Sequence, residues 1–60
     1  MELVNRIRNG EHASESEIRY NLRLLYSLWD EYDTYYNPQM LQKIRDGIAV
    51  LKEALAEYQC

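Results

Sequence analysis

The sequence has few of the residues that hold very small proteins together through covalent or metal bonds. Its 60 residues include one cysteine and one histidine. A disulfide within the chain is therefore excluded, and a zinc site would lack its usual ligands. A chain of this length buries only about 60 % of the surface that it exposes when unfolded. Association with another subunit is the remaining common source of stability, so we expect self-association.

Long apolar runs and a strong charge of either sign are also missing. No apolar stretch approaches the roughly 20 residues that a membrane-spanning helix needs. Residues 1–10 carry Glu2 and two arginines where a signal peptide would carry an apolar segment. A formal net charge of −3 argues against a polyanionic partner. We therefore expect one domain, residues 1–60, located in the cytoplasm.

The strongest structural signal begins at Ser14. Glu17 follows it at the spacing of a capping box, in which two side chains satisfy free N–H groups at a helix start. Apolar residues then recur in alternating steps of four and three, a heptad pattern that predicts a helix over residues 15–36. The residues in this seam are Ile18, Leu22, Leu25, Trp29, Tyr32 and Tyr36.

A second helix signal starts at Asn37-Pro38. Asparagine is a good N-cap, and proline suits the first turn of a helix while it disfavours helix in the residue before it. A second heptad pattern follows and predicts a helix over residues 38–58. Upstream, apolar residues at helical spacing before Gly10 predict a short helix over residues 2–9. The second seam contains Leu41, Ile44, Ile48, Leu51, Leu55 and Tyr58.

The two long helices must run antiparallel because the connection between them is so short. The numbers of facing residues then add up to about 77, which places Trp29 beside Gly47 and Ile48. On one edge of this hairpin, Asp33 and Arg45 are expected to form an ion pair between the helices. The predicted fold class is all-α, a short helix followed by a long antiparallel hairpin.

Further apolar residues flank both seams on the same side of the hairpin, and they predict an interface. The helix over residues 2–9 spans about 12 Å, whereas the flanking face is about 30 Å long, so this helix covers less than half of it. A second copy of the hairpin would cover the remainder, which predicts a homodimeric bundle of the four-helix type. The predicted interface residues are Leu24, Leu28, Tyr35, Met40, Gly47, Val50 and Ala54.

Tyrosine is over-represented at the tip of the predicted hairpin. The chain has six tyrosines and no phenylalanine. Tyrosine suits positions that are half packed and half wet, and it is common in protein interfaces. Acidic neighbours would suit a basic surface of another protein, although the tyrosines could also simply complete the hairpin core. The predicted docking tip consists of Glu31, Tyr32, Asp33, Tyr35 and Tyr36.

Residues for catalysis or cofactor binding are scarce. His12 and Cys60 are expected at the same end of the hairpin, but in a loop and at a chain terminus, where nothing orients an imidazole. A zinc site from these two and Glu15 has no recognised ligand spacing. Glu53 and Glu57 are expected on an outer helix face without a cavity, which gives no basis for acid–base catalysis. We expect no enzyme activity, no metal and no cofactor.

The sequence thus predicts a small noncatalytic module that binds another protein as an adaptor, subunit or inhibitor. The alternative is a dimeric accessory factor that contacts nucleic acid through arginines. The first half of the chain holds five acidic residues against four arginines, a balance that disfavours phosphate binding. The arginines of this alternative are Arg6, Arg8, Arg19 and Arg23.

Overall fold

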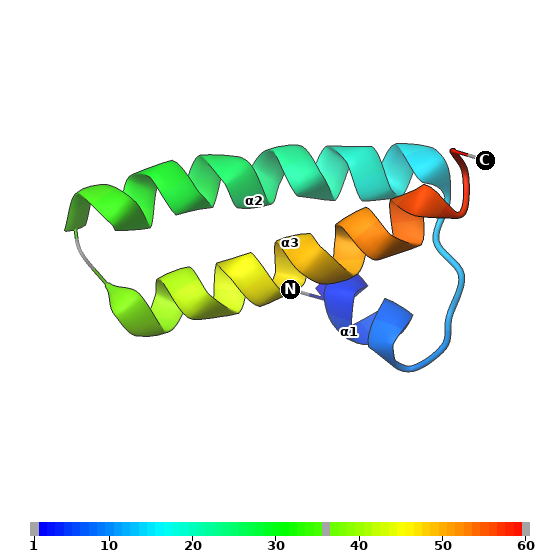
Figure 1. Ribbon diagram of the computed structural model, residues 1–60, viewed down its shortest axis with the longest axis horizontal. Helices are drawn as coiled ribbons and strands as arrows, with labels where there is room; N and C mark the ends of the chain where they lie inside the picture. The colour runs from blue at the N-terminus through cyan, green and yellow to red at the C-terminus, as the bar shows by residue number, and fades with distance from the viewer. Residues whose placement is uncertain (1, 36, 60) are drawn as a thin grey trace.

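A computed structural model of the chain describes residues 2–35 and 37–59, and within these it contains three helices and no strand. Helix α1 spans Glu2–Arg8, α2 spans Glu15–Tyr35 and α3 spans Pro38–Ala56. Figure 1 shows α2 and α3 as the arms of a hairpin, with α1 beside α3. The predicted all-helical fold is thereby confirmed. No helix in the described part of the chain combines the length and the apolar character needed to cross a membrane.

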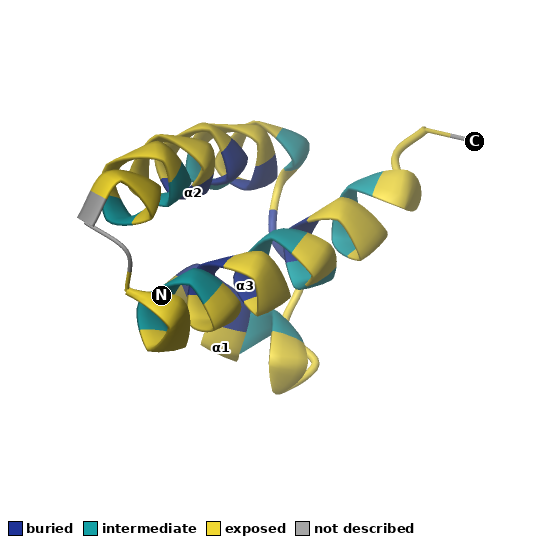
Figure 2. Cartoon of the chain, turned by 60° about the vertical axis from the view of Figure 1, so that its left-hand side comes forward, coloured by how far each residue is buried: buried dark blue, intermediate teal, exposed yellow. Residues whose placement is uncertain are grey.

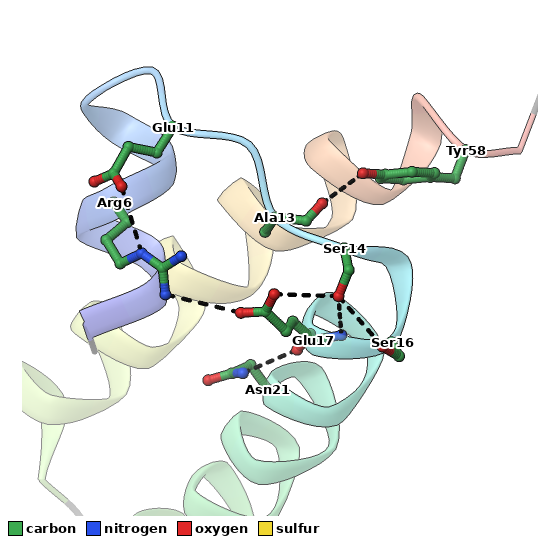
Figure 3. A network of polar contacts seen from close by, with 8 residues as sticks. All are labelled: Arg6, Glu11, Ala13, Ser14, Ser16, Glu17, Asn21 and Tyr58. Carbon is green, nitrogen blue, oxygen red and sulfur yellow. Dashed lines mark hydrogen bonds and ion pairs between the residues drawn. The ribbon is translucent and has the colours of Figure 1, made fainter.

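The capping box predicted at Ser14 starts α2 (Figure 3). The Ser14 Oγ accepts a hydrogen bond from the Glu17 N–H at 3.2 Å. The same hydroxyl donates to the Glu17 carboxylate, also at 3.2 Å. Ser14 therefore satisfies one of the N–H groups that a helix start leaves open. The Glu17 carboxylate bonds to the Ser14 hydroxyl and not to its N–H, so the reciprocal half of the predicted capping box is not formed.

The start of α3 also follows the sequence prediction. The Asn37 side-chain oxygen accepts a hydrogen bond from the Met40 N–H at 3.2 Å, and Pro38 is the first helical residue. Because Pro38 has no N–H, its position at the helix start leaves no donor unsatisfied. The predicted end of α2 at residue 36 lies outside the described residues.

The turn after α1 depends on Gly10. Its φ angle is +92°, a conformation that side chains with a Cβ rarely adopt. The Glu11 N–H donates to the Arg6 carbonyl and the Gly10 N–H to the Ile7 carbonyl, both at 3.0 Å. These are the two hydrogen bonds of a Schellman motif, so Gly10 ends α1 as the C′ residue that the sequence predicts.

The end of α3 differs from the sequence prediction, since the helix stops at Ala56 rather than at residue 58. The N–H groups of Tyr58 and Gln59 donate to carbonyls three residues earlier, whereas an α-helix would bond them to carbonyls four residues earlier. The chain is therefore wound more tightly here than in an α-helix. The Tyr58 hydroxyl donates to the carbonyl of Ala13 (Figure 3). This bond attaches the C-terminal end of the chain to the connection between α1 and α2.

The hydrophobic core lies near one end of the hairpin. We call the end where α2 begins and α3 ends the base, and the opposite end the tip. Along α2 the buried side chains stop at Leu25, and Figure 2 shows the dark blue of buried residues thinning out toward the tip. Ile44 and Leu51 of α3 are completely enclosed, each 0 % exposed. The buried hydrophobic residues are Leu3, Val4, Ala13, Ile18, Leu22, Leu25, Ile44 and Leu51.

Candidate protein-interaction surfaces

The tip region, which we define as residues 26–43, contains no buried residue among those whose side chains the structure describes. Its apolar residues are nevertheless numerous. Trp29 and Tyr32 of α2 and Met40 and Leu41 of α3 are half-buried, and Leu28 is 36 % exposed. The heptad seam therefore continues to the tip. Along α2 its described side chains are buried at the base but only half-buried in the tip region.

The α2 half of the predicted interface is open to solvent. Leu24 is 44 % exposed, and with Leu28 it belongs to the large exposed hydrophobic residues. The side chain of Tyr35 and the whole of Tyr36 lie outside the described residues, so their predicted roles stay predictions. Leu24 and Leu28 lie one turn apart, so their exposed surfaces adjoin on α2.

The α3 half of the predicted interface differs from the prediction. Gly47 is buried within the chain and offers no surface to a second copy. Met40, Val50 and Ala54 are half-buried. The reason is that α1 packs against α3, so that residues of both helices line the same hollows. Helix α1 thus covers more of α3 than of α2.

Trp29 is only half-buried, although the sequence predicts a buried side chain. It packs against the edge of the core, as does Ile48, its predicted neighbour on α3. Helix α1 packs mainly against α3, so it leaves the α2 side of the hairpin uncovered at this level. The indole consequently keeps part of its surface in solvent.

The acidic tip residues are accessible. Glu31 and Asp33 are exposed, Tyr32 is half-buried, and the last turn of α2 contains no basic residue. Within the described chain Asp33 forms no ion pair, so its predicted contact with Arg45 is wrong. An ion pair between two exposed side chains contributes little to stability, which explains why the expected pair is not formed.

Two of the four arginines of the nucleic-acid alternative, Arg6 and Arg19, do not share one patch. Arg6 lies 3.8 Å from the carboxylates of both Glu11 and Glu17, and it connects α1 to α2 (Figure 3). Arg19 lies 3.4 Å from Glu15. Because Arg19 follows Glu17 by two residues, it is turned by about 200° around the α2 axis. Arg6 and Arg19 therefore lie on different sides of α2, and each has acidic partners.

A hollow of about 380 Å³ lies at the base, between α1, the connection after it and the last turns of α3. Glu53 and Glu57 line it, which contradicts the expectation that they have no cavity beside them. His12 also lines this hollow and is exposed, whereas its predicted neighbour Cys60 lies outside the described residues. Within the described chain no three metal-binding side chains are grouped closely enough to hold an ion.

The sequence carries a partial signal for this hollow. Val50, Glu53, Ala54 and Glu57 follow one another at steps of three, one and three, which places all four on one side of α3. The pattern does not indicate the position of α1, whose packing forms the opposite wall of the hollow.

Comparisons of this chain with protein-family models, with curated proteins and with solved structures find no match.

Proposed function

We propose that this chain is a noncatalytic protein-binding module that forms a homodimer through its tip region and presents an acidic tip to a second protein. The observation that supports this proposal is the mismatch between pattern and burial along the hairpin. Apolar residues at core spacing continue through the tip region, yet none with a described side chain is buried there. Leu24 and Leu28 extend the same apolar surface.

The position of α1 indicates which side of the hairpin a second copy would cover. Arg6 of α1 contacts Glu17 of α2, so α1 lies on the Glu17 side. Leu24 follows Glu17 by seven residues, about two turns, which places it on the same side and about 10 Å nearer the tip. The open surface is therefore the continuation of the face that α1 covers at the base.

This arrangement restricts how two copies can pair. Helix α1 occupies the layer on top of the hairpin, so two whole hairpins cannot lie face to face. The tip regions of two copies can overlap, because each would fill the space beside the other's α1. A four-helix core would then form from the two tip regions, with Leu28 turned toward its centre.

The mass of the particle in solution tests the dimer. Light scattering at micromolar concentration should give twice the 7.2 kDa of one chain. The variant Leu28→Glu should give the mass of a single chain, because a buried carboxylate without a partner opposes association. Ala49→Glu is the matched control, since Ala49 is exposed elsewhere on α3 and a charge there should leave the mass unchanged. A single-chain mass for the unaltered protein would contradict the proposal.

The acidic tip is the part of the module assigned to another protein. Asp33 is exposed and its carboxylate forms no ion pair within the described chain. It is turned by about 160° from Glu17 around the α2 axis, so it stays available to a basic partner when a second copy covers the Glu17 side. Pull-down from cells of the source organism should recover that partner with the unaltered chain and lose it with Asp33→Lys. Gln42→Lys adds the same charge at another exposed position and should retain it. Equal recovery of the partner with the unaltered chain and with both variants would contradict a binding role for the acidic tip.

The nucleic-acid alternative has weaker support. Arg6 and Arg19 already lie beside glutamates, and phosphate binding would have to replace those contacts. Binding through arginines would weaken steeply as salt rises, so a salt titration with duplex DNA and with RNA separates the two functions. The absence of enzyme activity and the cytoplasmic location remain parts of the proposal that rest on the sequence.

A further inference from the structure

The hollow at the base combines an apolar floor with an acidic rim. Its volume of about 380 Å³ falls within the range of sites that bind small groups. Ile7, Val50 and Ala54 line it with half-buried side chains, and Ile18 below them is buried. Exposed polar side chains surround this floor. The lining residues with ionisable groups are Arg8, Glu11, His12, Glu53, Glu57 and Tyr58.

The rim carries an excess of negative charge. Three carboxylates line the hollow against one guanidinium, that of Arg8. Glu11 is close to Arg6, but Glu53 and Glu57 form no ion pair within the described chain. These two follow each other at a spacing of four residues, so their like charges are neighbours on the surface of α3.

The placement of these glutamates runs against helix electrostatics. Carbonyl groups at a helix end give it a partial negative charge, which favours lysine or arginine nearby and disfavours glutamate. The last turn of α3 has no basic residue, and Glu57 is its C-cap. Neither glutamate has an ion pair within the described chain to offset the repulsion, and such a departure from local rules is expected where a residue serves binding.

We propose that this hollow binds a segment of another protein in which a lysine or arginine stands next to an apolar residue. The apolar side chain would contact Val50 and Ala54. The cation would lie between Glu53 and Glu57, where it relieves their repulsion and meets the negative end of α3. This site lies at the opposite end of the hairpin from the tip region, so it does not depend on the function proposed above.

The test uses the full chain, nuclear magnetic resonance and a defined probe. The probe is the peptide acetyl-Leu-Lys-Leu-Lys-amide, and the matched peptide has glutamine in place of both lysines. Backbone amide signals of Val50, Ala54 and Glu57 should move on titration at low salt, while that of Leu28 stays in place. The glutamine peptide should bind at least about tenfold more weakly.

Two variants assign the effect to the rim. The double variant Glu53→Gln with Glu57→Gln should lower the affinity for the lysine peptide by about tenfold, with helix content unchanged by circular dichroism. The control Asp30→Asn with Asp46→Asn removes the same charge from exposed positions outside the hollow and the docking tip, and it should change affinity by less than about twofold. Equal binding of both peptides, movement of Leu28 in place of Val50, or no movement at about 5 mM peptide would overturn the proposal.

Discussion

The side-chain ammonium of Lys52 lies 5.8 Å from the centre of the Tyr26 ring. This contact joins α3 to α2 on the side of the hairpin away from α1, because Tyr26 follows Glu17 by nine residues, or two and a half turns. It therefore closes one edge of the hairpin while α1 covers the other. The pair also fits the predicted register of facing residues to within one position.

The contact between Tyr26 and Lys52 predicts a small, measurable coupling. A cation above an aromatic ring at an exposed site contributes about 0.5–1 kcal/mol. Lys52→Met should lower the free energy of unfolding by about that amount when Tyr26 is present, and by less in a Tyr26→Leu background. Urea unfolding of the unaltered protein, the two single variants and the double variant at one protein concentration measures the coupling. Equal losses in both backgrounds would show that the two side chains do not interact.

The capping box predicts the effect of a change at Ser14. Ser14→Ala removes both the acceptor for the Glu17 N–H and the donor to the Glu17 carboxylate. The free energy of unfolding should fall by about 0.5–2 kcal/mol, as for other N-cap serines replaced by alanine. Ser27→Ala is the control, because Ser27 is exposed in the middle of α2, where alanine is the better helix former. A loss of equal size in both variants would contradict the capping role.

Trp29 reports on the tip region because it is the single tryptophan of the chain. It is half-buried in one copy, and a second copy over the tip region would enclose it. Its fluorescence should therefore move to longer wavelength on dilution, and Leu28→Glu should show the long-wavelength emission at every concentration. Light scattering on the same samples supplies the mass. An emission that stays constant while the mass halves would place Trp29 outside the interface.

Much of the fold could be predicted from the sequence because short-range rules decide it. Ser14, Asn37 and Gly10 each form the local hydrogen bonds that their residue types favour, so the helix boundaries near them follow from spacing alone. The hairpin follows from the two heptad patterns and the short connection between them. These features need no knowledge of how distant segments pack.

Long-range packing explains what the sequence did not predict. The burial of Gly47 and the hollow beside Glu53 both depend on where α1 lies against α3, and three apolar residues in α1 do not determine that position. The end of α3 depends in the same way on a residue far away in the chain. Tyr58 leaves the helix pattern and bonds to Ala13, a contact that periodicity cannot indicate.

That bond between Tyr58 and Ala13 gives the last prediction. This partly buried hydrogen bond joins the C-terminal end of the chain to the connection between α1 and α2. Tyr58→Phe keeps the ring and removes the donor, so the Ala13 carbonyl loses its partner. The free energy of unfolding should fall by about 0.5–1.5 kcal/mol, the usual net contribution of one such bond.

Hydrogen exchange adds a local measurement to the test of Tyr58→Phe. Amides of the connection around Ala13 should exchange faster in this variant, while those around Leu25 follow only the change in global stability. Tyr20→Phe is the matched control, because Tyr20 is 62 % exposed and its loss of a hydroxyl should change stability by less than about 0.5 kcal/mol. If exchange near Ala13 were the same in both variants, the hydroxyl of Tyr58 would not hold the base together, and the walls of the hollow there would depend on the packing of α1 alone.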